Sequence, residues 1–172
     1  MSKKYLIASD LHGSLIALDR VLELVNEHMA DKLLLLGDIF GTNASEMVER
    51  LNNISNRLTI VKGNNDWYFE PENAKFMIMK EAYENINGQI AYLCHGHKLN
   101  DMYLEGYGAK IVMIGHVHRP ILQNNNGIIF MCPGSMAVPR FGCDKTYALI
   151  DDKKIQILTD SGELVDELML EK

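Results

Sequence analysis

The sequence predicts an α/β protein built around a largely parallel sheet. In the first third of the chain, short apolar runs alternate with longer stretches whose apolar residues recur every three or four positions, as in β-α-β units. Acids, histidines and an asparagine then follow the apolar runs at their carboxyl ends, where ligand sites of open α/β sheets collect. The length of 172 residues fits a single domain over residues 1–172.

The N-terminal part predicts strands and helices in alternation. In the first helix, Leu15, Leu18, Val21 and Val25 form an apolar stripe that would lie on a sheet. The expected elements are strand Lys4–Ser9, helix Ser14–Met29, strand Lys32–Leu36, helix Ala44–Ile54 and strand Arg57–Lys62.

Beyond Asp66 the pattern changes to strand-like runs separated by turns. Lys75–Met79 and Gln89–Cys94 are apolar, and the turn-rich Asn85–Gly88 between them indicates either a hairpin or a strand exchange between sheets. A short helix, Leu99–Tyr107, is expected before a buried strand. The remaining strands are expected at Lys110–Ile114, Ile121–Gln123, Ile128–Cys132, Tyr147–Ile150, Ile155–Leu158 and Glu163–Leu170, and those after Lys110–Ile114 are antiparallel in character.

Composition argues against several classes of protein. No apolar run approaches the ~20 residues that cross a bilayer, and the first residues lack the apolar segment of a signal peptide, so we expect a cytoplasmic protein without a membrane partner. The net charge of −6 disfavours a stable nucleic-acid complex. Cys94, Cys132 and Cys143 have no C-x-x-C spacing, and we expect reduced, mostly structural thiols.

Five predicted strands are each followed by residues that can bind metal. In strand order, these residues are Asp10 with His12, Asp38, Asn64, His95, and His116 with His118. Each has a local alternative: Asp10 as a helix N-cap, Gly37-Asp38 and Gly63–Asp66 as turns, and a lone histidine as a core or surface residue. These alternatives do not explain why all of them share one position relative to a strand.

The number of these candidate ligands favours two metal ions over one. Seven residues exceed the four or so protein groups that one catalytic ion uses, so one carboxylate should bridge two ions. Imidazole and oxygen ligands without sulfur suit manganese, iron, nickel or zinc, and the residues themselves do not choose among these.

The motif order D-x-H, G-D, G-N, H-G-H, G-H-x-H resembles that of the calcineurin-like metallophosphoesterases. Segments Ala8–Ser14 and Cys132–Pro139 are similar to those of the YfcE-type phosphodiesterases within that superfamily, and the likeness covers nearly the full chain. The resemblance implies a four-layer αββα sandwich of two mixed β-sheets flanked by helices. It also implies a dimetal enzyme, with manganese expected, that hydrolyses a small phosphate ester, a phosphodiester, by hydroxide attack on phosphorus.

The same resemblance implies a role for each candidate residue. It gives Asp10, His12 and His118 to one metal, Asn64, His95 and His116 to the other, and Asp38 to both. It places His97 near the metal centre, in contact with a metal ligand or with the substrate phosphate. Asp38, Asn64, His97 and Asn65 are therefore the expected catalytic residues.

One position departs from the pattern of the superfamily. Many members carry G-N-H-[DE], with the histidine near the leaving group, whereas this chain has Gly63-Asn64-Asn65-Asp66. An amide can donate a hydrogen bond but cannot deliver a proton near neutral pH. We therefore expect turnover to favour good leaving groups, and Asp66 to brace the loop.

Two other functions remain open at this point. A phosphomonoesterase would use the same metals, because the motifs do not fix the number of ester bonds. The retromer scaffold subunit shares this fold and has a degraded metal site, yet Asp38 and Asn64 are both present in this chain. A homodimer is expected. The aromatic run Trp67–Phe69 is expected in the core or in the wall of a substrate pocket.

Overall fold

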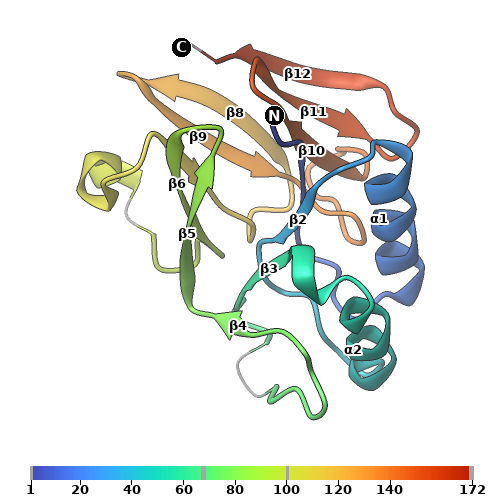
Figure 1. Ribbon diagram of the computed structural model, residues 1–172. Helices are drawn as coiled ribbons and strands as arrows, with labels where there is room; N and C mark the ends of the chain where they lie inside the picture. The colour runs from blue at the N-terminus through green and yellow to red at the C-terminus, as the bar shows by residue number, and fades with distance from the viewer. Residues whose placement is uncertain (1, 67–68, 100, 171–172) are drawn as a thin grey trace.

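Two mixed β-sheets lie face to face in the computed structural model of the chain (Figure 1), which describes residues 2–66, 69–99 and 101–170, with the backbone alone for 101–103. The strands of the larger sheet are β1 (Tyr5–Ala8), β2 (Lys32–Leu35), β3 (Leu58–Val61), β4 (Ile78–Met79), β10 (Thr146–Ile150), β11 (Lys154–Thr159) and β12 (Leu164–Met169). Their order is β12-β11-β10-β1-β2-β3-β4, with β1 to β4 parallel and the other pairings antiparallel.

The smaller sheet has the order β5-β6-β7-β9-β8. Its strands are β5 (Glu81–Ile86), β6 (Gln89–Cys94), β7 (Ile111–Met113), β8 (Pro120–Asn125) and β9 (Ile128–Pro133). The central strands β6, β7 and β9 are parallel, and the edge strands β5 and β8 pair antiparallel with their neighbours. The carboxyl ends of parallel strands from both sheets thus supply the loops that carry the candidate ligands.

Helices flank the sheets on their outer faces. The helical elements are α1 (Leu15–Glu27), α2 (Ala44–Asn52) and the 3₁₀ segments η1 (Ser55–Arg57) and η2 (Asp101–Tyr107). α1 and α2 cover the larger sheet, and η2, at the left of the view, lies outside the smaller one (Figure 1). Ser14 is the N-cap of α1, because its Oγ accepts a hydrogen bond from the Ala17 amide at 3.2 Å. Capping by Ser14 leaves Asp10 for another role.

The strands of the larger sheet are apolar on both faces because both faces are covered. Side chains alternate across a strand, so Leu6 and Leu33 point toward the helices while Ile7 and Leu34 point toward the smaller sheet. A third apolar cluster, which includes Leu104 of η2, covers the outer face of the smaller sheet. These clusters separate four layers, as the predicted αββα sandwich requires, although the fourth layer is only a short 3₁₀ segment and loops.

The chain crosses between the sheets at Lys80. The predicted strand Lys75–Met79 is reduced to the two residues of β4, which pair with β3 in the larger sheet. β5, which the sequence did not predict, starts directly afterwards in the smaller sheet and forms a hairpin with β6. Of the two predicted alternatives for this region, the strand exchange is confirmed for Lys75–Met79.

The remaining elements follow the prediction within a few residues at their ends. The strands predicted after β7 are present and each pairs antiparallel with a neighbour, but β9 also pairs parallel with β7, which the prediction did not include. The short helix expected at Leu99–Tyr107 is a 3₁₀ segment over Asp101–Tyr107. Asn100, Trp67 and Tyr68 lie outside the described residues; Phe69 stacks on Phe40 with ring centroids 4.2 Å apart, as a core residue would.

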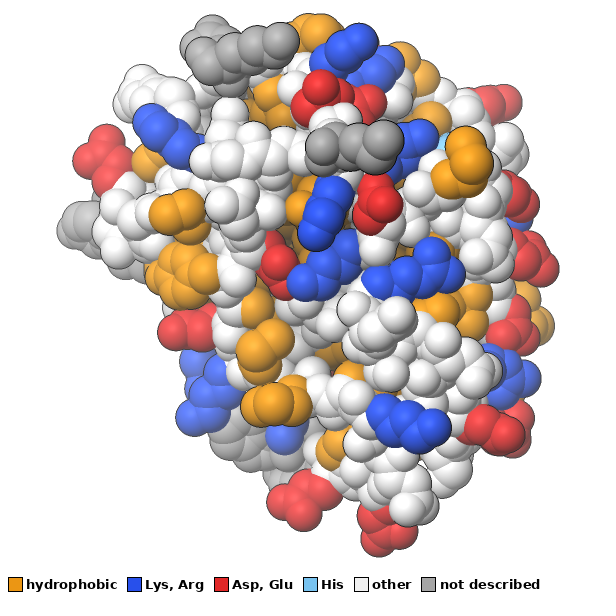
Figure 2. All heavy atoms as spheres, viewed as in Figure 1, with side chains coloured by type: hydrophobic (Ala, Val, Ile, Leu, Met, Phe, Trp, Pro, Cys, Tyr) orange, Lys and Arg blue, Asp and Glu red, His pale blue; other side chains and the backbone are white. Residues whose placement is uncertain are grey.

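The described surface mixes charges of both signs. Figure 2 shows one face, on which Lys and Arg side chains near the centre are interspersed with Asp and Glu. No helix among the residues that the structure describes is long and apolar enough to span a membrane. Cys94 and Cys132 are buried free thiols, and burial raises their pKa to about 11 and about 12, as expected for structural cysteines.

Candidate metal centre

The loops after the strands hold their polar residues in an uncommon backbone conformation. Asp10, His12, Asp38, His116 and His118 have φ angles of 57°, 46°, 52°, 69° and 57°. Left-handed backbone costs free energy in residues other than glycine, and such strain concentrates at functional sites. These loops therefore keep their shape because surrounding contacts fix it, and those contacts aim the side chains inward.

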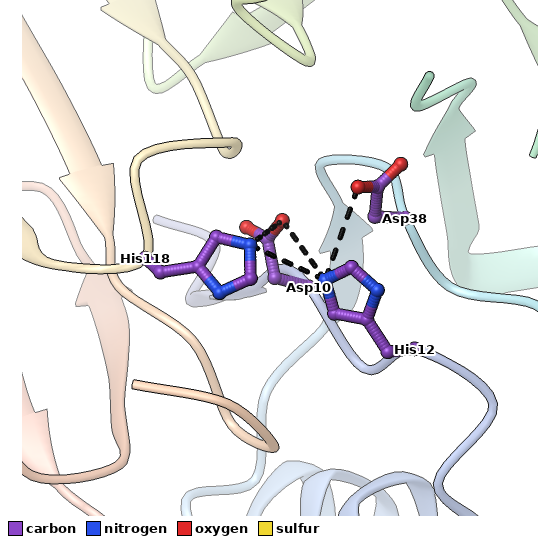
Figure 3. Close-up of side chains that lie close together, drawn as sticks. All are labelled: Asp10, His12, Asp38 and His118. Atoms are coloured by element: carbon purple, nitrogen blue, oxygen red, sulfur yellow. Dashed lines mark hydrogen bonds and ion pairs between the residues drawn. The ribbon is translucent and has the colours of Figure 1, made fainter. Parts of the chain in front are cut away.

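Four of the predicted ligands form one compact group (Figure 3). Asp10, His12, Asp38 and His118 each offer a ligand atom, and these atoms all lie within 4.8 Å of one another. Nε2 of His118 lies 3.2 Å from Oδ1 of Asp10 and 3.2 Å from Nε2 of His12. Nε2 of His12 lies 3.8 Å from Oδ2 of Asp38. Carboxylates and imidazoles at such distances can share one divalent ion.

Backbone carbonyls orient two of the imidazoles. Nδ1 of His118 lies 2.6 Å from the carbonyl oxygen of Val138, and Nδ1 of His95 lies 2.7 Å from that of Leu36. A carbonyl can only accept, so each Nδ1 carries a proton. With a metal ion bound, each Nε2 would present its lone pair to that ion. This arrangement is common for histidines that bind metals in proteins.

Asp10 is the most deeply buried acid of the group. Its side chain is 0% exposed, and Oδ2 accepts a hydrogen bond from the His116 amide at 3.0 Å. Oδ1 has no hydrogen-bond partner among the described residues, and burial raises the pKa of the carboxyl. A buried carboxylate oxygen that accepts no hydrogen bond is costly, so a cation beside it fits this site.

The other predicted ligands adjoin this group through Asp38. Nε2 of His95 lies 3.3 Å from Oδ2 of Asp38 and 3.1 Å from Oδ1 of Asn64. His116 lies beside His95, with the two ring centroids 5.1 Å apart in an edge-to-face arrangement. His95 therefore joins Asp38 to the other two predicted ligands, Asn64 and His116.

The loop after β3 holds Asp38 in place. The Asn65 amide and the Asn65 Nδ2 donate to Oδ1 and Oδ2 of Asp38 at 2.8 Å and 2.6 Å. Burial opposes ionisation of Asp38, but hydrogen bonds from His95 and Asn65 outweigh it and keep its pKa below the usual range. Asp66 accepts from the amides of Ile39, Phe40 and Gly63, so the prediction that it braces the loop is confirmed.

His97 lies beside the centre on its exposed side. Its ring centroid is 5.5 Å from that of His95 and 6.1 Å from that of His116. Burial, the neighbouring His95 and Lys98 lower the pKa of His97. A neutral, exposed imidazole at this position suits the predicted contact with a ligand or a phosphate.

The hydroxyl of Ser135 supports the ligands in a way that was not predicted from the sequence. Ser135 is buried; its Oγ donates to the carbonyl oxygen of Asp10 at 2.8 Å and accepts from the amide of Val138 at 2.8 Å. Ser135 thus connects the loop of Asp10 to the carbonyl that orients His118. Ser135 lies in Cys132–Pro139, which carries part of the family resemblance. The sequence does not show which carbonyl or hydroxyl of such a segment will hydrogen-bond to a ligand residue.

The fold and this arrangement of acids and histidines define a phosphoesterase domain. Residues 4–154 match the Calcineurin-like phosphoesterase superfamily domain, and the chain belongs to that superfamily. This confirms the family predicted from the motif order, and with it the enzyme class.

Within this superfamily, the chain is similar to several individual proteins. The chain is 29% identical over 167 residues to Phosphodiesterase YfcE of Escherichia coli (strain K12), covering 90% of this chain and 91% of that protein. The solved structure of that phosphoesterase superposes with a TM-score of 0.88 at 27% identity, covering 98% of this chain and 100% of the other. Vacuolar Protein Sorting 29 of Cryptosporidium parvum, at 21% identity, a TM-score of 0.77 and 99% coverage of both chains, shows the fold alone.

Proposed function

We propose that this chain is a dimetal phosphodiesterase that hydrolyses small phosphodiesters. The observation that carries the proposal is the position of Asp38, whose Oδ2 lies 3.8 Å from Nε2 of His12 and 3.3 Å from Nε2 of His95. One carboxylate oxygen thus faces both groups of predicted ligands. The likeness to a phosphodiesterase of Escherichia coli supports the choice of substrate class.

The proposed ligand sets follow the two sides of Asp38. Asp10, His12 and His118 would hold one divalent ion, and Asn64, His95 and His116 the other. When bound, two such ions lower the pKa of water toward neutrality and neutralise the oxygens of a phosphate ester. The chain, with a net charge of −6, needs such positive charge to hold an anionic substrate.

The residues of the chain have distinct parts in this proposal. Asp38 stays ionised near neutral pH because His95 and Asn65 stabilise its charge. Asn65 donates to Asp38 and has no acidic proton to give, so we propose that the leaving group departs without a protonated side chain at this position. His97 would hydrogen-bond to the substrate phosphate from the exposed side.

The proposal is tested with one matrix of metals and substrates. Metal-stripped protein is supplied with Mn, Ni, Fe, Zn or Mg, and hydrolysis of aryl phosphodiesters and matching monoesters is followed. We expect close to two ions bound per chain, the highest activity with manganese, and a higher kcat/KM for the diester.

Each alternative gives a different result in the same matrix. Preference for the monoester would replace the phosphodiesterase with a phosphomonoesterase of the same centre. Protein that stays inert with every metal would support the scaffold function, for which the fold likeness to Vacuolar Protein Sorting 29 is the precedent. The single domain, the homodimer and the cytoplasmic location stay predictions.

A further inference from the structure

A pocket opens beside the candidate centre, on the side of His95. It encloses about 320 Å³, and His95, Gly63 and Gly96 form part of its wall. Gly63 also touches Asp38 so closely that any side chain at this position would collide with the carboxylate. Because pocket and centre share this wall, a phosphate bound at the centre would place one of its ester groups at or in the pocket. A pocket of this size takes a small organic group.

Three lysines from separate segments converge on this pocket. Lys62 follows β3, Lys80 lies at the crossing between the two sheets, and Lys98 is in the loop after β6. This local excess of positive charge contrasts with the net charge of −6 of the chain. Such a concentration of cations attracts and holds anionic groups.

Among the described residues that line the pocket, Glu81 is the one acid, against three lysines. Oε2 of Glu81 accepts a hydrogen bond from the hydroxyl of Tyr92 at 2.7 Å. The ring of Tyr92 in turn stacks on that of Tyr107, with centroids 4.6 Å apart. Together with Leu99, these rings supply the apolar part of the pocket wall.

We propose that this pocket binds the second ester group of the phosphodiester, the one not released, and favours groups that carry a further anionic charge. The apolar wall would contact the body of that group, and the lysines would hold its charge. This inference rests on the proposed function, because it assumes that a phosphodiester is bound at the centre.

A matched pair of substrates tests the proposal. Thymidine 5′-(4-nitrophenyl phosphate) and its 3′-phosphorylated form release the same leaving group and differ by one phosphate. We expect kcat/KM to be about fivefold higher for the 3′-phosphorylated substrate, and the ratio to decrease as salt is added, because exposed charges are screened. Calorimetry should likewise show tighter binding of thymidine 3′,5′-bisphosphate than of thymidine 5′-phosphate, a readout that needs no turnover.

Substitution of the exposed lysines tests whether the pocket causes the preference for the substrate with the additional phosphate. Lys80→Gln and Lys98→Gln should each bring both ratios toward one, and the double variant, which keeps Lys62, should bring them closer to one than either single variant does. Lys80 and Lys98 are both exposed, so these variants should fold. Lys75→Gln is the matched control: Lys75 is also exposed but lies outside the pocket, and its substitution should leave the ratios as in the wild type.

The outcomes separate this inference from the function on which it rests. Hydrolysis of both substrates at equal kcat/KM would overturn the inference and leave the phosphodiesterase intact. A preference that neither the single variants nor the double variant reduces would also overturn it, because the anion would then bind elsewhere. If neither substrate were hydrolysed with any metal, the proposed function would fail and the inference with it.

Discussion

The two sides of the candidate centre differ in how deeply the protein buries them. On one side, Asp10 and His118 are at most 2% exposed and His12 is partly exposed, and Asp38 between the two sides is 2% exposed. On the other side, Asn64 is exposed and His116 is partly exposed, although His95 is buried. The buried side is therefore set by the fold before any ligand arrives, whereas the open side adjoins solvent and the lysine-lined pocket, where a substrate would enter.

Loss of the carboxylate that faces both sides should have the largest effect. Asp38→Asn keeps the size of the side chain but removes its charge, so we expect kcat/KM to fall on the order of a thousandfold. Metal content by elemental analysis should fall on both sides together. Asp152→Asn, on the exposed surface, is the control. If Asp38→Asn bound two ions and kept its activity, the two sides would be independent of this residue.

Substitution of Asp66, which braces the loop after β3, should have the next largest effect. Asp66 is 0% exposed and accepts three backbone hydrogen bonds, so Asp66→Asn should lower the free energy of unfolding by about 2 kcal/mol. Urea denaturation of the metal-free protein measures this change.

A control for the brace is available in an exposed turn. Asp151 likewise accepts from backbone amides, those of Lys153 and Lys154, at 2.7 Å and 3.0 Å. Asp151→Asn should cost much less, because water can replace these hydrogen bonds. Equal losses in the two variants would show that burial does not strengthen the brace.

Substitution of Asn65 tests the effect of a missing proton donor near the leaving group. Asn65→His would supply a group that can release a proton, so we expect kcat/KM to rise about tenfold for aryl esters with poor leaving groups and little for good ones. A series of substituted phenyl diesters measures the dependence on leaving-group pKa. In the wild type this dependence should be steep, and equal rates across the series would remove Asn65 from the role proposed for it.

His28, outside the centre, should give the smallest effect. Burial, with Lys4 nearby, lowers the pKa of His28, and its Nε2 lies 2.7 Å from the hydroxyl of Tyr147. Because this pKa is lower in the folded chain than the unfolded value of about 6.5, its contribution to stability is complete above that pH and is lost as pH falls below it. The free energy of unfolding should therefore decrease less between pH 7 and pH 5 in His28→Gln than in the wild type. Identical pH profiles would exclude this role.

The strands that carry the candidate ligands were predictable because their signals are local. Runs such as Leu33–Leu36 are apolar throughout, and polar residues follow them, most of these beside a glycine. β5 was missed because its outward positions are polar and Ala82 and Ile86 alone are buried. The pair Asn87-Gly88, with φ of 52° and 94°, is a strong signal for a β-hairpin. It lies within the predicted turn, but the prediction did not place a strand directly before that turn.

The sequence by itself determined the order of elements, the residue types that can hold divalent metals, and the family to which the chain belongs. Only the tertiary structure decided that Asp38 faces both groups of ligands, that carbonyls of Leu36 and Val138 orient two imidazoles, and that three lysines meet beside the centre. The reason is physical: strand and helix periodicity depends on near neighbours in the chain, whereas these contacts join segments that approach only when the two sheets pack.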